Sequence, residues 1–173
     1  MELHAQPQRI LLPAKVSFIV LTVAMALLFN LLPWRTSAGV PDLTAAVLAF
    51  WCIHQPRRVG IGIAWTLGLL LDVGNGALLG QHAFAYSVLA FAAVGLNRRI
   101  LWFSTWAQAL HVLLLLLASQ LLMLAVRLIA GDAFPGFAWF AGSGIAALLW
   151  PAVTFLLLLP QRQPGLVDVD RPI

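Results

Sequence analysis

AQALHVLLLLLASQLLMLAV, residues 107–126, contains no Asp, Glu, Lys or Arg. A helix needs about 20 mainly apolar residues to cross the hydrocarbon core of a bilayer, and this stretch alone is that long. Lipid offers no hydrogen-bond partners to open backbone, and a run this continuous does not alternate as the strands of a membrane barrel do. The stretch therefore predicts a transmembrane helix.

The rest of the chain follows the same pattern. Of its 173 residues, 62% are apolar and only 9% are charged, against roughly 45–50% and 25% in a soluble domain. The apolar runs and the prolines between them predict an all-α, polytopic integral membrane protein, with six transmembrane helices in one membrane domain covering residues 1–173. The expected spans are residues 16–32, 43–54, 60–79, 84–96, 106–130 and 137–159.

The basic residues predict the orientation of these spans. Cytoplasmic connections of membrane proteins are enriched in Lys and Arg, so we expect the side of the membrane that carries most of these residues to be the cytoplasmic side. The short N- and C-terminal tails are expected on the same side. Charge leaves open whether Gly60–Leu96 crosses twice or re-enters, because its two flanks share a side in both cases. The residues on the cytoplasmic side are Arg9, Lys15, Arg57, Arg58, Arg98, Arg99, Arg162 and Arg171, with Arg35 and Arg127 opposite.

Patterns for other chemistry are missing from the sequence. The basic residues form short pairs between apolar runs instead of a continuous patch, which does not favour nucleic-acid binding. Cys52 and His54 lie two positions apart, about 200° around a helix, and so do not share a face on which to bind a metal. We read no nucleophile with a base at a suitable spacing, no phosphate-binding glycine loop and no carboxylate pair. We therefore expect no enzyme, no cofactor and no metal site.

One polar motif lies inside the apolar sequence, GLLLDVGNGALLGQH from Gly68 to His82. Small residues recur here at every fourth position and form a ridge against which another helix can pack closely. Gly-Asn-Gly is a turn signal, and each glycine lowers helix propensity by about 1 kcal/mol, so we expect a break near Gly74–Gly76. The candidates for a helix-packing or partner-binding groove are Gly60, Ala64, Gly68, Asp72, Gly74, Gly76 and Gly80.

Asp72 lies at apolar depth in the third expected span, where a carboxylate is costly unless it is neutralised or bonded. Three environments remain open. It can cap the helix that restarts after the break, pair with Arg127 of the fifth span, or be protonated in a dry niche. In the same fifth span, Ser119 and Gln120 are expected to hydrogen-bond across helices.

QPRRVGIGIAWTLGLLLDVGNGALLGQHAFAYSVLAF, from Gln55 to Phe91, resembles the MreD family of rod shape-determining membrane proteins of bacteria. The matching features are Pro-Arg at positions 56–57, Gly60, GLLLD at 68–72, Gly76 and LGQHA at 79–83. The C-terminal half resembles the family only in its hydrophobic pattern.

The resemblance implies a non-enzymatic component of the inner-membrane machinery for cell elongation. Such a protein determines rod shape by docking membrane partners and so regulates peptidoglycan synthesis. The implied partners are MreC above all, then the MreB filament and a RodA-type polymerase with its transpeptidase partner. Independently of the resemblance, the short basic cytoplasmic loops can contact anionic membrane lipid. The family is also similar in fold to the substrate-binding membrane subunits of vitamin importers, so the alternative function is that of a small-molecule-binding transporter subunit.

Overall fold

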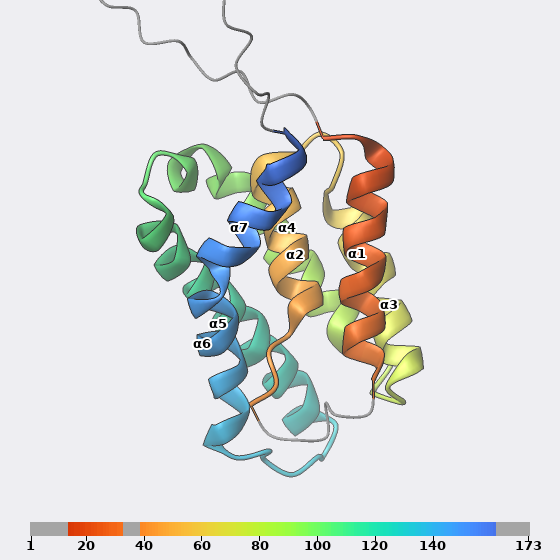
Figure 1. The fold of residues 1–173 in the computed structure, drawn as a ribbon. Helices are drawn as coiled ribbons and strands as arrows, with labels where there is room; N and C mark the ends of the chain where they lie inside the picture. The colour runs from red at the N-terminus through yellow and green to blue at the C-terminus, as the bar shows by residue number, and fades with distance from the viewer. Residues whose placement is uncertain (1–13, 33–38, 162–173) are drawn as a thin grey trace, which may run out of the picture.

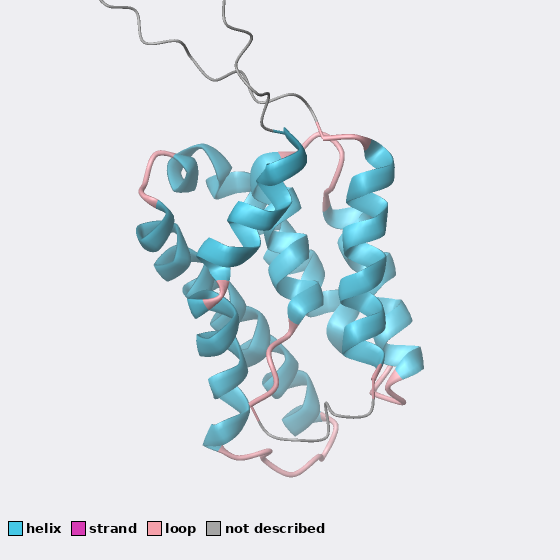
Figure 2. Cartoon of the chain, viewed as in Figure 1, coloured by secondary structure: helices cyan, strands magenta, loops and turns pink. Residues whose placement is uncertain are grey.

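The computed structural model describes residues 14–32 and 39–161, and every regular element in these two segments is helical (Figures 1 and 2). The expected all-α class is therefore confirmed for this part of the chain. Both terminal tails lie outside the described residues, as do Arg9, Arg35, Arg162 and Arg171. The elements are α1 (Val16–Leu31), α2 (Leu43–His54), α3 (Ile61–Gly74), α4 (Gln81–Leu101), α5 (Thr105–Ile129), η2 (Phe137–Phe140), α6 (Ala141–Leu148), α7 (Trp150–Leu158) and η3 (Leu159–Gln161).

The core of the bundle forms around α2 and α4. The α2 sequence, LTAAVLAFWCIH, is apolar on all sides, and a helix of this kind is stable only when it is surrounded. Most of its side chains are accordingly buried. Because α4 packs against α2, α3 and α5, it joins the first half of the chain to the second. Trp51, Tyr86 and Trp150 fill this core without any exposed surface.

The outer surface of the bundle is also apolar. Met25 on α1 is 63% exposed, Phe91 on α4 is 69% exposed and Trp106 on α5 is 68% exposed. Apolar surface of this extent fits hydrocarbon better than water. Both α4 and α5 are long and apolar enough to cross a membrane, and the helix pair from Phe137 to Gln161 adds a third candidate if it counts as one bent span.

The first three helices are apolar but shorter than a typical span. They contain 16, 12 and 14 residues, and 12 residues rise only about 18 Å at 1.5 Å per residue. The hydrocarbon core is about 30 Å thick. The structure thus supports two or three spans by length, and the six crossings expected from the sequence stay a prediction.

The third and fourth expected spans differ from the helices observed. The third, residues 60–79, contains the break expected near Gly74–Gly76, because α3 ends at Gly74 and the next helix begins only at Gln81. The fourth, residues 84–96, is too short at both ends, since α4 begins at Gln81 and continues to Leu101. Arginine is a good helix former whose long side chain can reach water from a helix end, so Arg98 and Arg99 extend α4 rather than terminate it.

The last expected span, residues 137–159, is divided between η2, α6 and α7. The two parts are bent by 42° at the break between Leu148 and Trp150. Pro151 lies in the first turn of α7, where its missing N–H is harmless, whereas its ring would clash with the carbonyl of the preceding turn in a continuous helix. Pro151 therefore accounts for the bend.

Candidate functional site

The α3–α4 connection breaks the polypeptide where the Gly-Asn-Gly signal predicts. After α3 ends at Gly74, the Ala77 N–H donates to the Asp72 carbonyl at 2.9 Å and closes a turn. Gly76 has a φ of 61° and Gly80 a φ of 97°. A side chain would be strained at these left-handed positions, so the two glycines permit the chain to reverse direction within a few residues.

The Asp72 carboxylate is bonded to the start of α4. It accepts hydrogen bonds from the backbone N–H groups of Gly80 at 2.9 Å, His82 at 2.9 Å and Ala83 at 3.4 Å. The first N–H groups of a helix have no partner within the helix, and a carboxylate is a preferred acceptor for them. Of the three environments considered for Asp72, the structure shows the first, a cap on the restarted helix.

His82 adds a side-chain partner to this cap. Its Nδ1 lies 2.7 Å from Asp72 Oδ1, and the two side chains are 7% and 0% exposed, respectively. Because a carboxylate without a proton can only accept, Nδ1 carries the hydrogen in this pair. The positive end of the α4 dipole further stabilises the negative charge of Asp72. The carboxylate thus holds the α4 backbone and orients the imidazole ring.

Arg127, the other partner considered for Asp72, interacts with a different carboxylate. Its Nε donates to Asp132 Oδ2 at 3.4 Å, in the connection that follows α5. The Arg127 side chain is 31% exposed and that of Asp132 is 56% exposed. An ion pair this long and this exposed contributes little to stability. The structure therefore places Arg127 near the polar end of the bundle but outside the Asp72 cap.

Most of the small-residue ridge faces helices of the same chain. A Cβ atom added at Gly68 would lie 2.3 Å from the Ala83 Cα, so α3 and α4 touch there backbone to backbone. One added at Gly74 would lie 2.3 Å from a methyl group of Leu31 in α1. Ala64 is buried as well. The remaining ridge glycines, which have open space around them, are Gly60, Gly76 and Gly80.

A second polar cluster joins α1, α2 and α4, and sequence reasoning missed it. Asp42 caps α2 by accepting from the Ala45 N–H at 3.0 Å. The same carboxylate accepts from Asn30 Nδ2 of α1 and, at 2.7 Å, from the Tyr86 hydroxyl of α4. Asn30 Nδ2 also donates to Thr44 Oγ1 at 2.8 Å. Asp42 immediately before an apolar run is a helix N-cap signal that could have located one part of this cluster.

The two carboxylates act at the same end of the bundle. Asn30 lies at the end of α1, Asp42 at the start of α2, Asp72 at the end of α3 and His82 at the start of α4. His82 and Tyr86, one turn apart on α4, pack edge to face with ring centroids 6.0 Å apart. The hydrogen bonds of the two carboxylates, linked by this ring contact, therefore join the ends of four helices.

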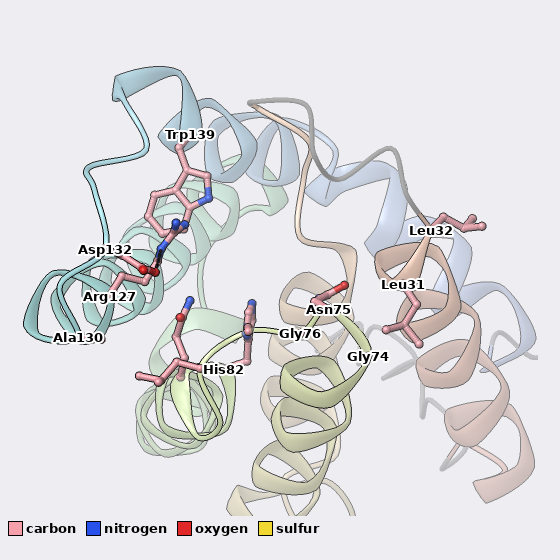
Figure 3. A pocket seen from close by; sticks show the side chains of 13 residues that line it. Leu31, Leu32, Gly74, Asn75, Gly76, His82, Arg127, Ala130, Asp132 and Trp139 are labelled. Atoms are coloured by element: carbon pink, nitrogen blue, oxygen red, sulfur yellow. Dashed lines mark hydrogen bonds and ion pairs between the residues drawn. The ribbon is translucent and has the colours of Figure 1, made fainter.

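A hollow of about 1000 Å³ opens beside the Asp72 cap. It lies between the α3–α4 connection and the end of α5. Figure 3 shows the His82 ring pointing into it, with Arg127, Asp132 and Trp139 to one side and Asn75 to the other. Gln81 also lines it. The arrangement brings an imidazole, two amides, a guanidinium and an indole to one open space, which suits the binding of a polar group.

The other polar residues singled out from the sequence serve the helices. Gln120 Nε2 donates to the Trp139 carbonyl at 3.2 Å, and Gln120 Oε1 accepts from Ser143 at 2.7 Å, so Gln120 joins α5 to α6 as expected. Ser119 is buried with no hydrogen-bond partner in residues 14–32 and 39–161. Cys52 is buried in α2. Across the same two segments, no group of three metal-binding side chains comes together.

The bundle has an apolar outer surface, and polar groups in its interior join the ends of its helices. These two features define its class, the helical integral membrane proteins. The chain matches the family described as rod shape-determining protein MreD over residues 10–159, and it belongs to that family. It is 34% identical over 144 residues to the rod shape-determining protein MreD of Haemophilus influenzae, which covers 80% of this chain and 86% of that protein. No solved structure matches the chain.

The family membership confirms the resemblance found in the sequence and supports a role in determining cell shape. Together with the apolar helices, it indicates a protein of the inner membrane. The similarity in fold to vitamin-importer subunits gains no support from a matching structure.

Proposed function

We propose that the protein is a non-enzymatic, multi-pass component of the cell-elongation machinery that docks MreC and thereby helps to regulate peptidoglycan synthesis. The MreB filament, a RodA-type polymerase and its transpeptidase partner belong to the same assembly in this proposal. The observation that carries it is membership of the shape-determining family, combined with a polar interior that holds helices together. Such an interior makes a rigid platform for partners in the membrane.

The proposed topology has six crossings, with both termini in the cytoplasm. Arg57 and Arg58 follow α2, and Arg98 and Arg99 end α4. Gln55 and Leu101 line a common cavity, so these two basic pairs lie at one end of the bundle. The hollow with Arg127 lies at the other end. A fluorescent protein that matures only in the cytoplasm, fused to the C-terminus, should fluoresce; a dark but stably inserted fusion would contradict this topology.

The proposed docking surface is the exposed face of α3. Gly68 cannot contribute, because α4 already packs against it. Gly62 and Thr66 are exposed and lie four residues apart, the small-x-x-x-small spacing that lets two membrane helices approach closely. Nothing lies within 4 Å of a Cβ added at Gly62. Val73, 71% exposed, extends the same face toward the hollow. This face can take the transmembrane helix of MreC.

The test is co-purification of MreC with Gly62→Leu. Forcing extra methylene groups into a close-packed contact typically costs about 1–3 kcal/mol, so the variant should retain roughly tenfold less MreC. Gly144→Leu is the matched control, because Gly144 is also an open helical glycine but belongs to α6. Equal retention by both variants would remove α3 as the docking surface.

Gly68→Leu makes a poor test of docking, although the sequence alone favours it. Its side chain would collide with the Ala83 backbone, which cannot move aside as a flexible side chain can. The variant should therefore lose α3–α4 packing and stability before any partner is considered. Comparing its insertion and melting behaviour with those of Gly62→Leu separates a folding defect from a docking defect.

The alternative function is a small-molecule-binding subunit of a transporter. One observation favours it, the hollow of about 1000 Å³ at the α3–α4 break, because transporters place ligands where membrane helices are interrupted. Depletion of the protein distinguishes the two functions. Rounding of rod-shaped cells with normal nutrient uptake supports the role in elongation, and loss of one uptake activity with normal shape supports transport.

A further inference from the structure

Two buried side chains present unpartnered polar groups to the hollow. Gln81 is 6% exposed and His82 is 5% exposed, and both line it. The Gln81 amide has no hydrogen-bond partner in residues 14–32 and 39–161, and neither has His82 Nε2, since only Nδ1 is bonded to Asp72. Their polar atoms are not fully enclosed by the described residues and remain accessible from the hollow that both side chains line. These two groups are therefore positioned for a ligand that enters the hollow.

Arg127 supplies a positive charge to the same space. Only its Nε is bonded, at 3.4 Å to Asp132, so the two terminal nitrogens of the guanidinium have no partner among the described residues. Guanidinium groups bind carboxylate and phosphate through paired donors. Asp132, at 56% exposure, is free to turn toward water when a stronger anion approaches. The Asp72 carboxylate is already bonded to four donors, so it does not compete with an incoming anion for Arg127.

The rim of the hollow is apolar. Leu31 and Leu32 at the end of α1 and Leu78 in the α3–α4 connection line it and are 36%, 43% and 49% exposed. These side chains continue the lipid-facing surface of the bundle. Trp139 lies on another wall (Figure 3), and tryptophan favours the interface between headgroups and hydrocarbon. The hollow thus combines polar donors inside with an edge suited to acyl chains.

We infer that the hollow binds the phosphate-bearing headgroup of a membrane lipid. The phosphate accepts from Arg127 and from the Gln81 amide, and from His82 Nε2 when the ring carries both protons. The acyl chains lie along the leucine rim. This site is separate from the exposed face of α3, and its occupancy does not depend on whether MreC docks there.

The test uses the full chain purified from bilayers of phosphatidylglycerol, with retained lipid counted by native mass spectrometry. Arg127→Gln should lower retention by about tenfold, the loss expected for a hydrogen bond to a charged group. Arg98→Gln is the control, since it removes a basic residue from the opposite end of the bundle. Equal retention by the wild type and both variants would show an adventitious lipid only and overturn the inference.

A second variant excludes misfolding as the explanation. Asp132→Asn removes the carboxylate that competes with phosphate for Arg127, and it changes an exposed side chain. Retention of phosphatidylglycerol should rise, a direction that damage to the fold does not produce. Unchanged or lower retention would contradict the site.

Two further probes identify the source of the anion. Diacylglycerol has the acyl chains without the phosphate and should not be retained; equal retention would overturn the proposed recognition of the headgroup. Inorganic phosphate at millimolar concentration should displace little lipid, because it lacks the contacts with the leucine rim. Its binding in place of the lipid would overturn the lipid assignment in favour of a free anion.

Discussion

Asp72 and Asp42 hold the same end of the bundle in different ways. Asp72 is fully buried and takes its partners from residues 80–83, a few positions along the chain. Asp42 is half-buried and connects Asn30 of α1 with Tyr86 of α4, far apart in the sequence. One carboxylate shapes a local chain reversal, whereas the other joins helices. An aspartate therefore stabilises a local connection at one position and a tertiary arrangement at the other.

The largest effect is expected from Asp72→Ala. Leaving one buried donor without its acceptor costs about 1–3 kcal/mol. Here three backbone N–H groups and the His82 ring lose their acceptor at once, so the unfolding free energy should fall by about 3–5 kcal/mol. Unfolding by SDS titration in mixed micelles, followed by tryptophan fluorescence, measures the loss. Asp132→Ala removes an exposed carboxylate as the control and should change the unfolding free energy by less than about 1 kcal/mol.

Asp42→Ala should cost less, about 2–3 kcal/mol, the sum of a lost helix cap and imperfectly replaced hydrogen bonds. Its half-buried position allows water to reach part of the cluster. The same SDS titration applies to this variant. A loss equal to that of Asp72→Ala would show that the difference in exposure between the two carboxylates does not determine how much each stabilises the fold.

Tyr86→Phe should have the smallest effect, about 1 kcal/mol, because it removes the hydroxyl that donates to Asp42 and keeps the ring packing. Ser87→Ala is its control, since within the part of the chain that the structure describes the Ser87 hydroxyl bonds only to the Ala83 carbonyl of its own helix. If α4 is joined to Asp42 through the hydroxyl, Tyr86→Phe lowers the unfolding free energy more than Ser87→Ala does. The reverse order would remove Tyr86 from the fastening of the helix ends.

The same contrast explains what could be predicted from the sequence. The cap by Asp72 was foreseeable because acceptor, glycines and donors lie within one short motif. The Asn30–Asp42–Tyr86 cluster forms only when three helices pack together, and no local sequence pattern predicts which helices become neighbours. Gly68 illustrates the intermediate case. Its spacing predicted close packing, but only the structure shows that the neighbour is α4 of the same chain.

Helix ends were predicted least well where two signals conflict. The charges of Arg98 and Arg99 mark the edge of an apolar run, but their backbone continues in α4. Residues 75–79 are as apolar as many helices, yet the positive φ of Gly76 and Gly80 turns them into a loop. In both cases the hydrophobicity of a residue indicates whether it lies in lipid or in water. Whether the helix continues depends instead on the backbone conformation that the residue prefers.

The buried thiol of Cys52 makes transient opening of the helical bundle measurable. It is the single cysteine of the chain, and its side chain has no exposed surface in the last turn of α2. A maleimide dissolved in the aqueous phase reacts with this thiol only after α2 has parted from its neighbours. The rate of alkylation therefore measures how often α2 separates transiently from the neighbouring helices, and no engineered label is needed.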